Sequence, residues 1–404
     1  MPEEKRYNQY AEDGICFDEN ISLESDIEDS TVNQDEYKNV SIYARDWTVG
    51  TFISQIEQGN VDLNPEFQRR NAWDDNKRSR LIESLIYGLP VPEIVLAEQT
   101  HERKKFIVID GKQRLITIAG FCMPDRYNVW TKPRLQRLKN NSILNGKSYA
   151  DFADSMDEYK RMLDNALLRC SVIINYQDEG VLFDIFYRLN SGSVPLTTQE
   201  LRQALIRGEF SAFLIQETDR DNVLRKVLGL KAAHKRLVDV EILLRIISFN
   251  FFWEEYNGNL KVFLDESMKR INKEWRNFDE MVKFYVRRLY DTIDVLKIVF
   301  DDYKKIGRKY ISAANQESRF NRVLFECLVL CFDGIDVRVV KEKKEEFINK
   351  FALVCSENAD FKLSIDSTTK TIQSYACRFD ILKNIVKEVF GVENNKFTFD
   401  RDVK

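Results

Sequence analysis

The 404-residue sequence has little of several residue types, and each shortage excludes a class of protein. It contains two histidines, His101 and His234, which lie far apart and have no second ligand at a metal-binding spacing. The sequence therefore lacks the histidine ligands that a histidine-metal nuclease or an HExxH hydrolase needs. The seven cysteines are scattered and form no CxxC pair, so they predict reduced core thiols and not a disulfide framework or a zinc ribbon.

Long apolar runs are also missing, and the N-terminus lacks the basic start and apolar block of a secretory signal. We therefore expect a cytoplasmic protein without membrane spans. With 44% hydrophobic residues, a chain of this length can bury a large core without help from metals or disulfides.

Charge is distributed unevenly along the chain. Residues 1–40 contain twelve acidic and three basic residues, a balance of −9 within a total of −4, which leaves +5 for residues 41–404. The acidic segment has little apolar periodicity and predicts a flexible leader. Two interpretations stay open: a solubilising leader, or a tail that folds back over a basic surface and competes with nucleic acid.

The residue pattern predicts an α+β fold. Thr48 can cap an amphipathic helix, and the apolar runs 94–96 and 106–109 predict paired strands of a small mixed sheet. Residues 171–176 predict a further strand, and the motif Thr197-x-x-Glu200 predicts a capping box at a helix start.

Beyond about residue 210 strand signals almost vanish, and long amphipathic runs predict an all-helical region. We therefore expect a flexible acidic segment (1–40), a small mixed sheet with helices (41–210) and a helical domain (211–404). No Pro/Gly/Ser linker separates the last two parts, so they are expected to pack together.

The strongest local signal for chemistry is the run Asp110-Gly111-Lys112-Gln113-Arg114, which joins a predicted strand to a predicted helix. Free helix amides at such a junction attract anions, Gly111 allows close approach, and Lys112 and Arg114 supply positive charge for a phosphate. Asp110 could hold a divalent cation or orient a water. The alternative is a plain Asp-Gly turn with solvated charges, because short motifs often match by chance.

A second cluster combines cations, an amide and flat rings, a composition suited to phosphates and a base face. Its members are Phe67, Gln68, Arg69, Arg70 and Trp73. Core packing is the alternative for the two rings, and a solvated helix face is the alternative for Lys77. Arg188 and Asn190, at the end of a predicted helix and the start of a Gly-containing loop, form a third polar set.

Several of these segments follow one another in an order that resembles a known family. They are NPEFQR (64–69) with Trp73, LIESL (81–85), GLPVP (88–92), DGKQRL (110–115), and FYRLNSG (186–192) followed by Leu196 and ELR (200–202). In this order they resemble the N-terminal domain of GmrSD-type restriction proteins, which is similar in fold to ParB and sulfiredoxin and carries a DGQR-like motif. The resemblance covers about residues 41–210.

The resemblance implies a domain that binds and hydrolyses a nucleoside triphosphate, with Mg²⁺, in bacterial defence against phage or modified DNA. It implies catalytic roles for Asp110, Gln113 and Arg114, with Asp110 as the metal ligand. The other residues expected at the nucleotide are Gln68, Arg69, Gly111, Lys112, Arg188 and Asn190.

The sequence departs from the family pattern in two ways. Lys112 stands where the family commonly has Gln, which adds a charge near the phosphates. Complete members also carry a C-terminal HNH nuclease, whereas residues 235–404 contain no histidine. We therefore expect the sensor half of such a system, with any HNH cleavage supplied by a separate nuclease or effector protein. Sulfiredoxin chemistry is not expected, because its reactive Cys has no counterpart at 110–114.

Three hypotheses follow. The first is a Mg²⁺-dependent NTPase that regulates a partner effector. The second is a non-catalytic module that binds DNA through Phe67, Arg70, Trp73 and Lys77, and the third is a ParB-like nuclease that uses Asp110 or Glu66 with a metal. The preferred NTP, the sensing of DNA modification and the formation of a homo-oligomer stay open.

Overall fold

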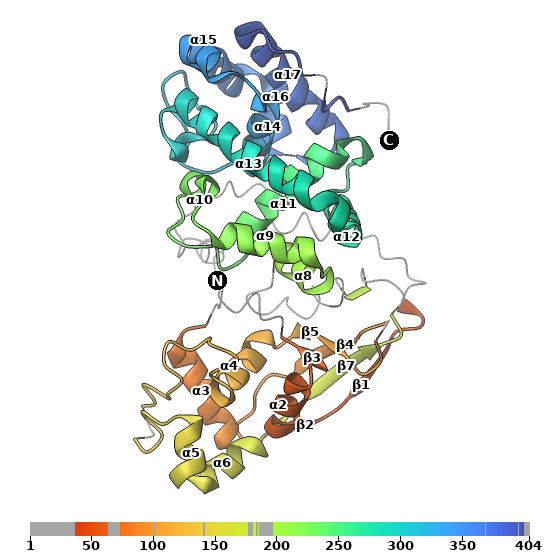
Figure 1. Cartoon of the computed structure of the whole chain (residues 1–404), viewed down its shortest axis with the longest axis vertical. Helices are drawn as coiled ribbons and strands as arrows, with labels where there is room; N and C mark the ends of the chain where they lie inside the picture. Colours follow the sequence, from red (N-terminus) through yellow and green to blue (C-terminus); the bar gives the residue numbers. More distant parts are fainter. Residues whose placement is uncertain are drawn as a thin grey trace. The chain divides into compact units, whose positions relative to one another are not determined.

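The computed structural model describes residues 37–63, 73–100, 102–139, 142–176, 181–182, 185, 197–367, 369–394 and 396–399 (Figure 1). Contacts divide the chain into two compact units, and the boundary falls between Leu205 and Ile206. The roles expected for residues 1–40, 41–210 and 211–404 stay predictions.

The first unit is built on a five-stranded mixed sheet with the strand order β1-β7-β4-β5-β3. The strands are β1 (Ser41–Ala44), β3 (Val61–Asp62), β4 (Ile94–Glu98), β5 (Phe106–Asp110) and β7 (Cys170–Ile174). β4 pairs antiparallel with β5, as predicted, and parallel with β7. β1 pairs antiparallel with β7, and β3 pairs parallel with β5. Two short strands, β2 (Trp47–Thr48) and β6 (Leu167–Leu168), form a separate antiparallel pair.

Both faces of the central strands are buried, which explains why they read as continuous apolar runs. On β4, Ile94 and Leu96 belong to one core, whereas Val95 and Ala97 belong to the core on the opposite face. The second core includes apolar residues of α8 (Thr198–Leu205). Helices that contribute to the first core or pack around it are α2 (Val49–Glu57), α3 (Asp75–Ile86), α4 (Lys112–Cys122), α5 (Tyr149–Ser155) and α6 (Asp157–Asp164) (Figure 1).

Two predicted helix starts are confirmed. The Thr48 hydroxyl accepts a hydrogen bond from the Thr51 amide at 3.1 Å at the start of α2. At α8, the Thr197 amide donates to Glu200 Oε2 at 2.6 Å and the Glu200 amide donates to Thr197 Oγ1 at 3.1 Å, so both halves of the capping box form.

The second unit is helical, as the sequence predicts, so the α+β class with a helical C-terminal region is confirmed. Its helices are α9 (Glu209–Asp219), α10 (Val223–Leu228), α11 (Val238–Phe252), α12 (Leu260–Lys273), α13 (Trp275–Phe300), α14 (Arg322–Phe332), α15 (Val337–Glu357), α16 (Ala359–Asp366) and α17 (Ile372–Phe390), with short 3₁₀ turns η6 (Trp253–Glu255) and η7 (Tyr303–Lys305). Within the described part of the chain, no helix has the length and apolar character needed to cross a membrane.

Candidate functional site

The DGKQR run forms the junction between β5 and α4. β5 ends at Asp110, and Gly111 adopts a left-handed backbone conformation (φ 90°) immediately before α4 begins at Lys112. A Cβ on Gly111 would lie 2.3 Å from Ile94 Cδ1 and 3.1 Å from Arg114 Nη2. Both the backbone conformation and the lack of space therefore require glycine here, and neither requirement depends on a ligand.

Arg114 is held by groups of the protein itself. Its Nη2 donates to Asp110 Oδ2 at 2.8 Å and to the Glu93 carbonyl at 2.9 Å. The side chain of Arg114 is 13% exposed and that of Asp110 is 37% exposed. The structure thus brings two of the expected catalytic residues together, and it balances the charge of Arg114 with the carboxylate of Asp110.

The start of α4 nevertheless leaves polar groups unsatisfied. Gly111 offers no side chain to cap the helix, so the first-turn amides receive no side-chain cap. Gln113 Oε1 and Arg114 Nε are buried and have no hydrogen-bond partner among the described residues. Such groups are rare in native proteins because a lost hydrogen bond to a buried polar atom costs roughly 1–3 kcal/mol. The junction therefore combines a hydrogen-bond acceptor on Gln113, a cationic donor on Arg114 and the positive end of the α4 dipole.

Several predicted site residues lie outside the described residues. They are Glu66, Phe67, Gln68, Arg69, Arg70, Arg188 and Asn190. Their expected position beside Asp110 and Arg114, or against DNA, stays a prediction.

Trp73 and Lys77 lie together at the start of α3. The Lys77 ammonium is 4.4 Å from the centroid of the Trp73 ring, while Trp73 also packs against the first core. Asp74 caps the helix by accepting a hydrogen bond from the Lys77 amide at 2.8 Å. Trp73 is thus a half-buried ring at the edge of the core, and its contact with DNA stays a prediction.

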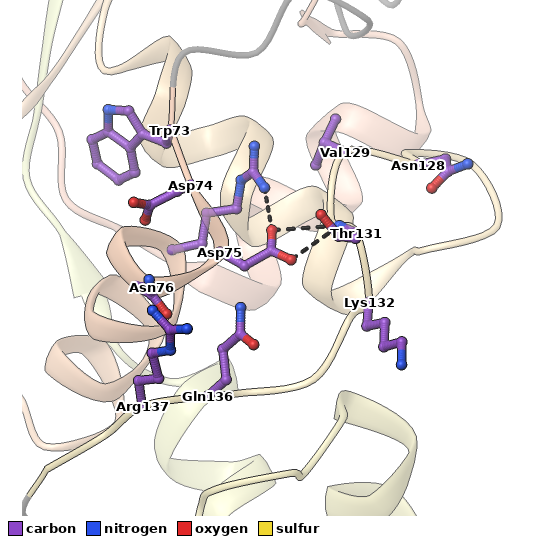
Figure 2. A pocket seen from close by; sticks show the side chains of 11 residues that line it. Trp73, Asp74, Asp75, Asn76, Asn128, Val129, Thr131, Lys132, Gln136 and Arg137 are labelled. Atoms are coloured by element: carbon purple, nitrogen blue, oxygen red, sulfur yellow. Dashed lines mark hydrogen bonds and ion pairs between the residues drawn. The ribbon is translucent and has the colours of Figure 1, made fainter.

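A cavity of about 630 Å³ opens beside Trp73 (Figure 2). One wall is the start of α3, and the other is the loop that connects α4 to α5. The lining residues are Trp73, Asp74, Asp75, Asn76, Arg78, Asn128, Val129, Thr131, Lys132, Gln136 and Arg137.

Asp75 joins the two walls of this cavity. Its carboxylate is buried, pairs with Arg78, and accepts a hydrogen bond from the Thr131 amide at 3.1 Å (Figure 2). The loop wall, which supplies Lys132 and Arg137, was not predicted from the sequence. Its signal was the interleaving of apolar and polar residues through NVWTKPRLQR (128–137). The spacing fits neither a helix nor a strand.

The described residues contain no cluster of three or more His, Cys, Asp or Glu side chains that could hold a metal. Asp110 is the ligand that the junction itself would offer, so a metal there would need further ligands from a substrate. The thiol of Cys122, at the end of α4, is also unsuited to sulfiredoxin-like chemistry. Burial raises the pKa of Cys122 well above its ordinary range, so the nucleophilic thiolate does not form near neutral pH.

Comparison with known proteins adds one match. Residues 49–207 match the family described as GmrSD restriction endonuclease, N-terminal domain. The resemblance noted in the sequence is therefore confirmed for this region, which begins with α2 and ends just after α8. No curated protein and no solved structure matches the chain.

Proposed function

We propose that the GmrSD-type domain at residues 49–207 binds and hydrolyses a nucleoside triphosphate, and that the chain acts as the sensor of a restriction system and regulates a partner effector. The family match supports a restriction-system component. The nucleotide site is supported above all by Gln113 Oε1 and Arg114 Nε, two buried polar atoms without a described partner, at a helix start without a side-chain cap.

The ion pair between Asp110 and Arg114 determines how a nucleotide would bind. A phosphate that binds Arg114 through Nη2 must replace Asp110 or Glu93 as its acceptor, whereas Nε has no described partner to displace. A nucleotide that carries Mg²⁺ offers phosphate oxygens to Arg114 and a cation to Asp110, so both charges stay compensated after the exchange. In this proposal the metal arrives as part of the substrate, and Asp110 is the ligand that the protein provides.

The residues at the junction then have separate tasks in hydrolysis. Arg114 neutralises charge on the phosphates, and the first-turn amides of α4 bind their oxygens. Gln113 accepts a hydrogen bond from the attacking water, whose oxygen forms a bond to the γ-phosphorus. The bond from that phosphorus to the bridging oxygen breaks and the diphosphate leaves, while a proton of the attacking water passes to an oxygen of the transferred phosphate, which is released as inorganic phosphate.

The test is phosphate release from Mg²⁺ complexes of ATP, GTP, CTP and UTP by the purified full chain. Arg114→Ala removes charge-assisted hydrogen bonds that contribute roughly 1.5–3 kcal/mol, so we expect nucleotide affinity to fall about 10- to 100-fold and release to stop. Arg103→Ala, at an exposed arginine in the β4–β5 connection, is the matched control and should behave as wild type.

Asp110→Asn separates binding from turnover. This change removes the carboxylate that pairs with Arg114, so metal-free nucleotide should bind at least as well as to wild type, while Mg²⁺-dependent release is lost. Equal background release by wild type, Arg114→Ala and Arg103→Ala would refute the hydrolytic role.

DNA binding is the second candidate, and the cavity beside Trp73 is the observation that favours it. The nuclease hypothesis stays a prediction, because it depends on Asp110 or on Glu66, and Glu66 lies outside the described residues.

A further inference from the structure

In the loop wall of the cavity, apolar residues and polar residues alternate and have different roles. Between α4 and α5, residues 123–148 form no helix or strand in their described part. Apolar side chains nevertheless fix this loop to the first core, and they are Tyr127, Val129, Trp130, Leu135, Leu138 and Leu144. The residues between them line the cavity with polar groups, namely Asn128, Thr131, Lys132, Gln136 and Arg137. A long irregular loop held in place in this way is typical of a binding surface.

The floor of the cavity contains a buried charge with incomplete hydrogen bonding. Arg78 is 4% exposed, and its guanidinium pairs with the buried Asp75. Arg78 Nε and Asn76 Oδ1 are both buried and lack a hydrogen-bond partner among the described residues. A buried guanidinium and a buried amide oxygen are costly without partners, so these two atoms indicate that a polar ligand completes the site.

The lining indicates the class of that ligand. The half-buried ring of Trp73, which has the Lys77 ammonium over it, lines the cavity. Asn76, Asn128 and Gln136 carry amides that can both donate and accept hydrogen bonds, as the edges of nucleobases require. Lys132 and Arg137 are exposed at the cavity and form no ion pair within the described part of the chain, so their charge is available to a phosphate.

Size supports the same class, because about 630 Å³ lies within the roughly 300–1,000 Å³ of small-ligand sites. We propose that this cavity binds one unpaired nucleotide of a DNA strand. The base lies against Trp73 and the three amides, and the adjacent phosphate contacts Lys132 and Arg137. DNA as the source of the nucleotide rests on the proposed restriction role. The cavity residues are separate from the Asp110–Arg114 junction.

The first experiment measures DNA binding without any nucleoside triphosphate, as a function of salt. The probe is a fluorescein-labelled duplex with one unpaired base, and the fully paired duplex is its comparison. Each phosphate that is no longer neutralised makes the slope of log K against log salt shallower by about 0.9, so the double variant Lys132→Ala/Arg137→Ala, which removes both contacts to the one adjacent phosphate, should lose about 0.9 units of slope. Lys139→Ala, at an exposed lysine of the same loop outside the cavity, should lose none.

The second experiment tests whether the base enters the cavity. Stacking of the unpaired base on the Trp73 ring contributes to the binding free energy, so Trp73→Ala should reduce the preference for the duplex with the unpaired base about tenfold. Trp73→Phe should keep most of this preference. A 2-aminopurine at the unpaired position should change its fluorescence with wild type and with Trp73→Phe. Thermal unfolding of each variant checks that the domain remains folded.

Three results would overturn the inference. One is a double variant whose salt slope equals that of Lys139→Ala. Another is a Trp73→Ala variant that prefers the unpaired duplex as strongly as wild type. The third is binding of dAMP or dTMP to the cavity by a protein that binds neither duplex, because the ligand would then be a free nucleotide. Loss of phosphate release in Arg114→Ala is measured separately, so failure of the hydrolytic proposal leaves these results interpretable.

Discussion

A single methyl group on α4 should disturb the cavity beside Trp73 by displacing its loop wall. Gly120 is buried where α4 passes the loop that forms the cavity wall. A Cβ at this position would lie 2.3 Å from Val129 Cγ2, 2.9 Å from Trp130 Cδ1 and 3.0 Å from the Tyr127 carbonyl oxygen. One of these atoms is backbone and the other two belong to buried side chains, so the loop must shift to accommodate alanine.

The expected change in the free energy of unfolding follows from two opposing contributions. Alanine favours a helix interior over glycine by about 1 kcal/mol. Overpacking a buried site costs roughly 1–3 kcal/mol, and the upper half of that range applies because the backbone itself is contacted. We therefore expect Gly120→Ala to destabilise the first unit by about 1–2 kcal/mol. Because Asn128 and Thr131 lie on the displaced loop, affinity for the unpaired duplex should also fall.

Hydrogen exchange over residues 123–148 and duplex binding measure the two effects. Gly50→Ala is the matched control, since Gly50 is also helical and its nearest neighbour, the Asp164 carbonyl, lies 3.3 Å from the added Cβ. Faster exchange in the loop and weaker binding are expected for Gly120→Ala alone. Wild-type exchange and wild-type affinity in Gly120→Ala would show that α4 and the loop are not packed as described.

Two further predictions concern stability and reactivity. Glu326→Gln should destabilise the helical unit by about 3 kcal/mol in thermal unfolding, because it removes the carboxylate at 2.8 Å from the buried Arg245 and leaves Glu241, at 4.0 Å, as its counter-charge. Arg245→Met/Glu326→Leu should be less harmful than the single change, and the opposite order would contradict this reasoning. Burial raises the pKa of Cys170 and of Cys355 to about 12, so both thiols stay protonated at pH 9 and should resist iodoacetamide until the protein is unfolded. Mass spectrometry of the native protein that finds both thiols alkylated at pH 9 as fast as in urea would contradict this assignment.

The sequence predicted best the features that depend on neighbours along the chain. The Thr48 cap and the Thr197–Glu200 capping box are local hydrogen-bond patterns. The β4–β5 hairpin joins two apolar runs across a short charged connection, so its pairing is also local.

Pairings between distant segments were not predicted. β1 and β3 are short strands whose partners, β7 and β5, lie far along the chain or run parallel to them. A two- to four-residue strand carries almost no periodicity, so only the assembled sheet identifies it.

The candidate site shows the same difference between local contacts, which were predicted, and contacts between distant segments, which were not. Asp110 and Arg114 are four residues apart across a helix start, and this spacing brings them within reach of each other. The third member of that contact, the Glu93 carbonyl, precedes β4 and reaches Arg114 only through the sheet. The loop residues of the cavity were missed for a related reason, because nothing in the local sequence places them opposite α3.

α4 connects the two proposed sites through contacts at both of its ends. Arg114, in its first turn, donates a hydrogen bond to the carbonyl of Glu93, the residue before the central strand β4. One turn later, the Thr117 carbonyl accepts a hydrogen bond from Trp130 Nε1 at 3.1 Å, and Gly120 allows the loop to approach the helix closely. A phosphate that replaces Glu93 at Arg114 removes one restraint on the helix while the loop contacts remain. If a nucleotide bound at Arg114 shifts α4, these contacts are the physical route by which the shift would reach the proposed DNA site.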